Sequence, residues 1–169
     1  MTPQKQAFHH RPEQGEFGDC ARTCLACMLD LDRDTVPNFG EHHGDGHAFK
    51  AAVDEFLASQ NLRQMELAYA GDMDLDKLLD VLGQMWPGIY VLFSGESRTG
   101  VNHMVIIKDG EIFWDPSLTD AGIVGPCDDG YYWVTLLIST KFVAPPAGSV
   151  EELLIDDAAD EASLDGAGQ

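Results

Sequence analysis

The stretch VNHMVIIKDGEIFWDP, residues 101–116, decides the fold of this chain. It contains two runs, 101–108 and 111–114, that are rich in β-branched and aromatic residues and therefore predict strands. The dipeptide Asp109-Gly110 between the runs is typical of a two-residue hairpin turn. We expect an antiparallel hairpin that brings the polar residues of this stretch onto neighbouring strands.

A buried helix is predicted upstream, from Gly18 to Leu31, where apolar or small residues recur at i, i+3 and i+4 spacing. Asp19 is placed to cap this helix, which puts Cys20 in its first turn. Two further helices are expected through 48–57 and over 74–85, and two further strands over 89–93 and 131–138. Helices thus precede strands, and we predict an α+β fold class with N-terminal helices packed on a C-terminal antiparallel sheet.

Length and composition predict a single domain. With 169 residues, of which 44% are hydrophobic, the chain can bury one sizeable core, which we expect to lie within 1–144. Acidic residues but no basic residue follow Pro146. We therefore expect 145–169 to form an acidic, flexible tail.

The charge balance excludes several kinds of partner. Lys and Arg number 10 against 29 Asp and Glu, which gives a formal net charge of −19, whereas nucleic acids and anionic membranes bind clustered basic residues. No apolar run is long enough to span a bilayer, and the N-terminus lacks the apolar stretch of a secretory signal. We therefore expect a cytoplasmic protein with no nucleic-acid or membrane partner and with reduced cysteines. The oligomeric state stays open.

Four residues have the chemistry of a cysteine nucleophile and its supporting groups. A helix N-terminus and a neighbouring imidazole favour the reactive thiolate, and Cys20 meets the first condition. Asp115, across the predicted hairpin from His103, can hold the imidazole of that histidine in one tautomer. Gln14, six residues before the cysteine, can donate its side-chain amide to an oxyanion.

The motifs around these residues are Gln14 with Gly18-Asp19-Cys20, the segments Cys24 to Leu29 and Asn102 to Ile107, and Trp114-Asp115-Pro116. This pattern resembles the papain-like cysteine peptidases. It is closest to the double-glycine leader peptidase domains of bacteriocin exporters, and it is also similar to small phage and bacterial papain-like proteins. The resemblance implies a papain-like fold. It also implies a nucleophile, a general base, an orienting carboxylate and an oxyanion donor at Cys20, His103, Asp115 and Gln14, respectively.

These groups predict a cysteine hydrolase that cleaves a peptide or isopeptide-type amide bond through a thioester, acting on a peptide or protein substrate without a cofactor. Two alternatives stay open. An amine could intercept the thioester, as in transglutaminases and acyltransferases, or a papain-like fold could serve as a non-catalytic module that blocks a host factor. Asp19, Arg98 and Asn102 are candidate substrate-binding residues.

Two cofactor sites are considered and not predicted. Cys20, Cys24 and Cys27 have the spacing of an iron–sulfur motif, but the chain is too short for the barrel of the radical enzymes that use it. Cys24 and Cys27 are instead expected in the core of the first helix. The second candidate is the loop with His42, His43, Asp45 and His47. No partner motif accompanies this loop, which favours a hydrated or substrate-flanking loop over a metal site.

Overall fold

The computed structural model describes residues 1–141, and the tail expected over 145–169 lies outside the described residues. The bounds of its helices and strands, in chain order, are α1 (Cys20–Leu29), α2 (Gly46–Ser59), β1 (Leu62–Ala70), α3 (Leu75–Met85), β2 (Val91–Glu96), β3 (Asn102–Lys108), β4 (Glu111–Trp114) and β5 (Tyr131–Ser139). The α+β class is confirmed. Within residues 1–141, no helix combines the length and the apolar composition needed to cross a membrane.

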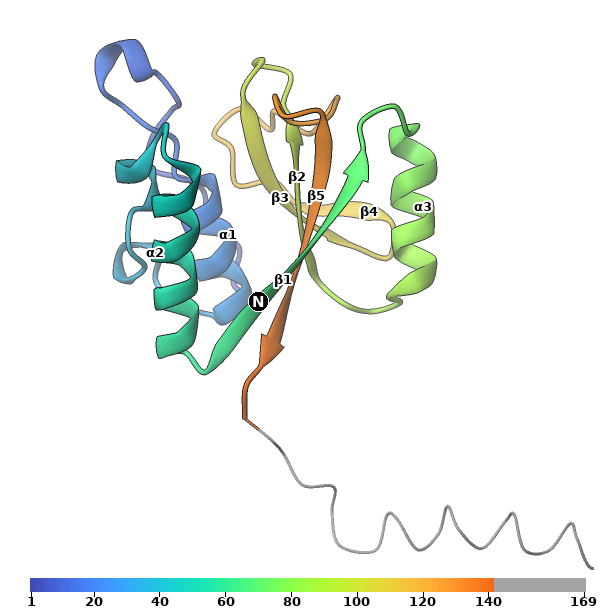
Figure 1. Cartoon of the computed structure of the whole chain (residues 1–169), viewed down its shortest axis with the longest axis horizontal. Helices are drawn as coiled ribbons and strands as arrows, with labels where there is room; N and C mark the ends of the chain where they lie inside the picture. Colours follow the sequence, from blue (N-terminus) through green and yellow to red (C-terminus); the bar gives the residue numbers. More distant parts are fainter. Residues whose placement is uncertain (142–169) are drawn as a thin grey trace, which may run out of the picture.

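The strands of the described chain form one antiparallel sheet in the order β1-β5-β2-β3-β4. Figure 1 shows α1 and α2 on one side of this sheet and α3 on the other. The expected packing of N-terminal helices on an antiparallel sheet therefore holds for α1 and α2, whereas α3 covers the opposite face.

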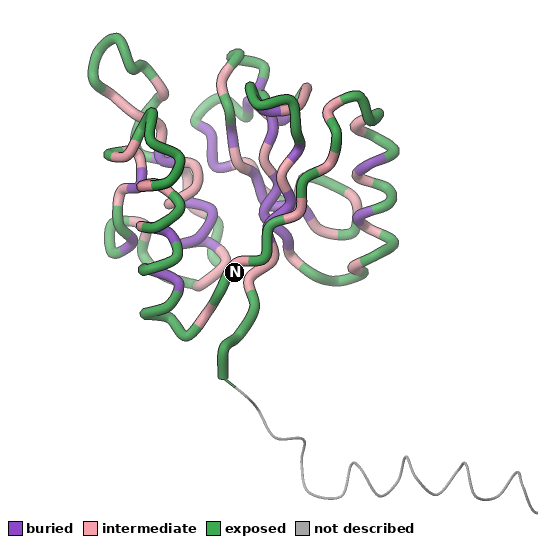
Figure 2. Tube along the Cα trace, viewed as in Figure 1, coloured by how far each residue is buried: buried purple, intermediate pink, exposed green. Residues whose placement is uncertain are grey.

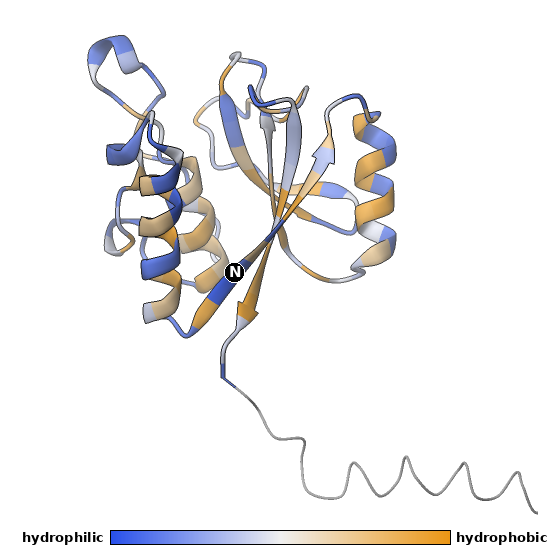
Figure 3. Ribbon diagram, in the orientation of Figure 1, coloured by the Kyte–Doolittle hydropathy of each residue, from blue (hydrophilic) through white to orange (hydrophobic). Residues whose placement is uncertain are grey.

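Successive side chains of β2 and β3 point to opposite faces of the sheet, which places one hydrophobic core on each face. Leu92 and Ile106 pack with the buried residues of α1 and α2. Val91 and Phe93 point the other way and pack with Leu82 of α3. The centre of the sheet is thus buried on both faces, as Figure 2 shows by burial and Figure 3 by hydropathy. Because full burial of one large apolar side chain contributes about 1.5–3 kcal/mol, this double core holds β3 firmly in place.

The predicted hairpin is present between β3 and β4. Asp109 and Gly110 form its turn with left-handed φ angles of 53° and 83°, as a two-residue hairpin turn of this kind requires. A register shift between Ile106 and Ile107 bends the pairing farther from the turn. The hairpin carries His103 near the start of β3 and leads to Asp115 directly after β4.

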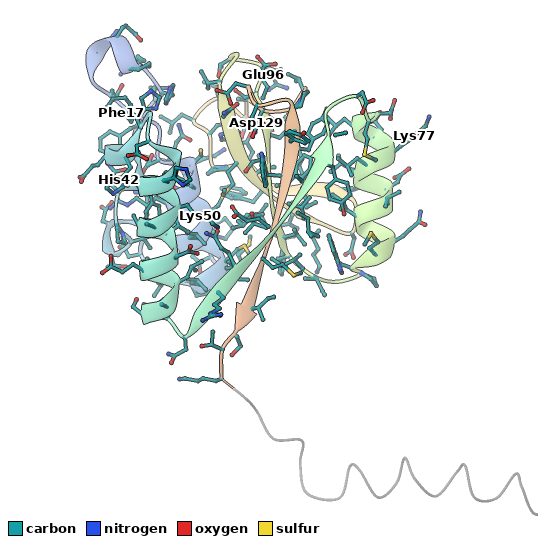
Figure 4. All side chains as sticks on the ribbon, in the orientation of Figure 1. Phe17, His42, Lys50, Lys77, Glu96 and Asp129 are labelled. Carbon is teal, nitrogen blue, oxygen red and sulfur yellow. The ribbon has the colours of Figure 1, made fainter. Side chains whose placement is uncertain are left out.

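β1 is a strand that the sequence does not predict, and it makes the expected order of helices before strands wrong. It lies between α2 and α3 in the chain and forms an edge of the sheet beside β5. Most of its residues are exposed or half-buried, so β1 lacks the apolar run of a central strand. Lys50 of α2, which Figure 4 labels, forms an ion pair with Glu66 of β1 and ties the helix to this edge.

Candidate active site

A cavity of about 310 Å³ lies where three chain segments meet. Its lining comes from the N-terminal segment 6–11, from 97–103, which connects β2 to β3 and includes the first two residues of β3, and from the loop 117–121 after β4. Cys20 also lines this cavity. The structure therefore brings Cys20 and His103 to one cavity, although they lie far apart in the sequence.

His103 and Asp115 form a direct hydrogen bond. The Nε2 atom of His103 lies 2.8 Å from Oδ1 of Asp115, and the two side chains are only 6% and 10% exposed. The backbone N–H groups of Ser117 and Gly122 also donate to the carboxylate, at 2.8 and 2.7 Å. The carboxylate is thus fixed on both oxygens, and the structure joins His103 to Asp115 as the hairpin predicts.

The surroundings of this pair shift both pKa values in the direction of an ion pair. Burial lowers the pKa of His103, but interactions with Asp115 and with the Cys20 side chain outweigh burial and raise this pKa to about 9. Burial likewise raises the pKa of Asp115, but hydrogen bonds from His103 and from two backbone N–H groups hold it well below its usual range. At neutral pH the structure therefore holds an imidazolium against a carboxylate.

Cys20 is the first residue of α1. The first N–H groups of a helix lack intrahelical acceptors and form its positive end, so Cys20 lies at the positive end of α1. The thiol of Cys24, about one turn farther on, donates to the carbonyl oxygen of Met104 at 3.4 Å and so fixes α1 beside β3. Because Asp115 binds Nε2 of His103, Nδ1 is the ring nitrogen left to exchange a proton with Cys20.

Lys5 holds the loop that carries Asp115. Its ammonium group donates to the carbonyl oxygens of Asp115 and Ser117 at 3.0 and 2.8 Å, and it also binds the Asp120 carboxylate at 2.5 Å. The N-terminal segment is therefore part of the framework of the site. Sequence reasoning misses Lys5 because nothing in its local pattern separates it from a surface lysine.

The structure does not bring Gln14 to the cavity. Gln14 is exposed and ends a short 3₁₀ turn, Pro12–Gln14. Arg11 and Glu16 close this turn through two backbone hydrogen bonds and a side-chain ion pair, so the residues between them project as the blue loop of Figure 1. The six-residue spacing to Cys20 therefore does not place the Gln14 amide beside the nucleophile.

Gln6 is the glutamine that lines the cavity, and it is only 8% exposed. Its backbone N–H donates to the carbonyl oxygen of Pro116 at 2.8 Å, and its Nε2 atom donates to that of Phe8 at 2.6 Å. An amide nitrogen carries two hydrogens, so one remains for a ligand. The sequence could have indicated Gln6 as a second glutamine upstream of Cys20. Its distance from Cys20 along the chain becomes short once the closed loop 11–16 is left out of the spacing.

The three candidate substrate-binding residues have other partners. Asp19 does not line the cavity and is buried. It is the N-cap residue of α1, as its position predicts, but its side chain makes no cap hydrogen bond to the helix. Asn102 lines the cavity but exchanges two hydrogen bonds with Asp128, at 2.7 and 3.0 Å. Arg98 lies outside the lining and donates to the carbonyl oxygen of Asp120. These contacts fix the walls of the cavity.

The remaining candidates lie outside the cavity. Cys24 and Cys27 are fully buried in the core, as predicted. His43 stacks on Phe17 with 4.6 Å between the ring centres, on the helical side of the molecule where Figure 4 labels Phe17 and His42. In the part of the chain that the structure describes, no three His, Cys, Asp or Glu side chains gather to hold a metal ion.

No family model, no curated protein and no solved structure matches this chain. Any function proposed for this protein therefore depends on the side chains that line or support the cavity. They provide a thiol at a helix N-terminus, an imidazolium held by a buried carboxylate, and a buried amide. Together these are the groups that attack on a carbonyl carbon requires.

Proposed function

We propose that the protein is a cysteine hydrolase that cleaves a peptide or isopeptide-type amide bond through a thioester intermediate. The observation that carries this proposal is the 2.8 Å contact between His103 and Asp115 in a cavity that Cys20 also lines. A single buried cysteine or histidine is more often structural. A nucleophile, a base and a group that orients the base, all at one cavity, meet the geometric requirements of nucleophilic catalysis. A papain-like arrangement of these groups is part of the same proposal.

In the first half-reaction, the thiolate of Cys20 attacks the carbonyl carbon of the substrate, and the new Sγ–C bond leaves negative charge on the carbonyl oxygen. The backbone N–H of Cys20 and the amide of Gln6 donate to this oxyanion. As the oxyanion collapses, the C–N bond breaks and the His103 imidazolium gives its proton to the leaving amine. A thioester on Cys20 and a free amine result.

In the second half-reaction, neutral His103 takes a proton from a water molecule whose oxygen attacks the thioester carbon. The second oxyanion collapses, the C–S bond breaks, and the product acid leaves. Cys20 is again a thiolate beside an imidazolium. Throughout both steps Asp115 keeps the proton on Nε2 of His103, so that Nδ1 faces the reaction.

Alkylation by iodoacetamide tests the nucleophile. We expect Cys20 to react faster than free cysteine at pH 7, because the helix N-terminus and the His103 imidazolium favour its thiolate. His103→Ala is expected to remove this advantage. Cys127 is the matched internal control, because burial, Asp129 and Asp128 raise its pKa to about 12 and keep it an unreactive thiol. Peptide mass spectrometry measures the rate of alkylation at both cysteines. A Cys20 that reacts no faster than free cysteine would contradict the proposal.

The substrate is sought by mass spectrometry of cell lysate treated with the protein or with Cys20→Ala. New peptide termini, or amide conjugates lost only with the active protein, are the outcomes expected of a hydrolase. New amide bonds to added amines would instead identify acyl transfer from the same thioester. Identical lysates after the two treatments would contradict amide cleavage.

A further inference from the structure

The N-terminal segment that carries Gln6 is held by a buried carboxylate. Asp19 is only 2% exposed and directly precedes Cys20. Its Oδ1 atom accepts hydrogen bonds from the backbone N–H groups of Ala7 and Phe8, at 2.9 and 3.1 Å. Hydrogen bonds to an ionised group are roughly twice as strong as those between neutral groups. Asp19 therefore fixes the backbone directly after Gln6.

Two arginines lie near the other oxygen of this carboxylate. The Oδ2 atom of Asp19 has no hydrogen-bond partner within residues 1–141, but guanidinium nitrogens of Arg22 and Arg33 lie 3.9 Å away. Arg33 also donates to the carbonyl oxygen of Lys5 at 2.8 Å. The backbone on each side of Gln6 is thus bound by one member of an acid–base pair, which we call the Asp19–Arg33 clamp.

The side chain of Gln6 is bound at the same clamp. Its Nε2 atom donates to the carbonyl oxygen of Phe8, and Asp19 holds the backbone N–H of that residue. Because Asp19 is also the neighbour of Cys20 in the chain, one side chain links the two proposed oxyanion donors. We infer that Asp19 is a positioning residue that sets the spacing between the Gln6 amide and the Cys20 backbone N–H. This inference rests on the proposed cysteine hydrolase.

The more usual role of an aspartate before a helix is to cap it, but the Asp19 side chain makes no cap hydrogen bond to α1. Its hydrogen-bonding capacity goes to the N-terminal segment instead. Two reagents that modify Cys20 can show whether Asp19 positions the oxyanion donors or only stabilises the fold. Alkylation of Cys20 by iodoacetamide forms no oxyanion, whereas acylation by p-nitrophenyl acetate passes through one.

Asp19→Asn is the variant for this test. Asparagine keeps an oxygen acceptor for Ala7 and Phe8, but it loses the charge and turns an amide NH₂ group toward the arginines. Because a displacement of about 1 Å in a site can cost about 100-fold in rate, we expect acylation of Cys20 to slow by about 10- to 100-fold. Alkylation by iodoacetamide is expected to keep its wild-type rate.

Asp34→Asn is the matched control. Asp34 pairs with the same two arginines at 3.5 and 3.0 Å, but its side chain is 69% exposed and lies outside the clamp, so both rates should stay unchanged. Acylation at the wild-type rate in Asp19→Asn, or an equal loss of both rates, overturns the inference and leaves Asp19 a structural residue. A wild-type Cys20 that reacts with neither reagent faster than free cysteine overturns the hydrolase proposal instead.

Discussion

Two glutamines upstream of Cys20 differ in the effect that their replacement is expected to have on acylation. Gln6 is buried in the lining of the cavity, whereas Gln14 is exposed on a closed loop. Because removal of one oxyanion donor costs about 100- to 1,000-fold in rate, we expect Gln6→Ala to slow acylation by p-nitrophenyl acetate by that factor. Gln14→Ala is expected to have no effect. Release of p-nitrophenolate measures both variants, and the reverse ranking would return the oxyanion role to Gln14.

The protonation of His103 gives a second prediction. Its pKa of about 9 depends on the charged hydrogen bond to Asp115, which acts against burial. We expect the imidazole NMR signals of His103 to titrate near pH 9. We also expect Asp115→Asn to lower this pKa markedly, because the neutral asparagine no longer stabilises the imidazolium against the effect of burial. His10 is an internal control, since burial and His43 lower its pKa in both proteins. A His103 that titrates near 6.5 in the native protein contradicts the ion pair.

The contact between α3 and the β3–β4 turn leads to a prediction about two helical glycines. A Cβ atom on Gly83 of α3 would lie 2.5 Å from the backbone nitrogen of Gly110, so the helix or the turn has to move. We expect Gly83→Ala to destabilise by about 1–3 kcal/mol despite the better helix propensity of alanine. Gly46→Ala in the first turn of α2 meets no atom within 4 Å and is the control. It is expected to be neutral or to stabilise by up to about 1 kcal/mol.

Urea unfolding of the two glycine variants measures both effects. A Gly83→Ala protein as stable as Gly46→Ala would show that α3 does not pack tightly on the hairpin turn. The comparison bears on the site as well, because that hairpin positions both His103 and Asp115. Loss of His103 protonation in Gly83→Ala would report a displaced hairpin.

The parts of the fold and site that the sequence predicts are those specified by local chemistry. The Asp109-Gly110 turn needs left-handed φ angles that these residue types supply, so the local sequence is enough to predict the pairing of β3 with β4. β1 escapes prediction because the only strand that pairs with it within residues 1–141 is β5, with Leu62 paired to Ser139 far along the chain. Gln6 escapes for the same reason, since its neighbours at the cavity come from three separate segments. Spacing along the chain cannot show such long-range contacts.

Two layers that pack on each other, the N-terminal helices and the sheet, supply the parts of the site. The nucleophile starts a helix that packs on one face of the sheet, the base lies within the sheet, and the segment 4–8 joins them. None of these groups reaches the cavity unless the helical layer and the sheet are both folded. The rate advantage of Cys20 over free cysteine toward iodoacetamide should therefore be lost in the same urea transition as the native fold.

The ion pair of His103 also makes the stability of the whole protein depend on pH. In the folded protein this imidazole has a pKa of about 9, whereas in the unfolded chain it titrates near its ordinary value of about 6.5. Between those values the folded state binds more protons than the unfolded state, so the free energy of unfolding falls as pH rises. From pH 6.5 to pH 8 we expect His103 by itself to contribute a loss of about 1–2 kcal/mol.

Urea unfolding of Cys20→Ala at constant ionic strength over this pH range separates the contribution of His103 from that of the proposed Cys20 thiolate, which would act in the opposite direction in the wild-type protein. His10, whose pKa burial and His43 lower, adds only a rise in stability close to pH 6.5. The carboxylates stay ionised throughout, and the buried thiols, whose pKa values burial raises, add a fall of the same sign only nearer pH 9. Asp115→Asn should flatten the slope, because it removes the charge that keeps His103 protonated. A stability of Cys20→Ala that stays level from pH 6.5 to pH 8, or a slope that persists when Asp115→Asn is added to this variant, contradicts the ion pair. Below about pH 4 the sign reverses, because the Asp115 carboxylate, with its pKa held low in the folded state, loses its stabilising contribution as it is protonated.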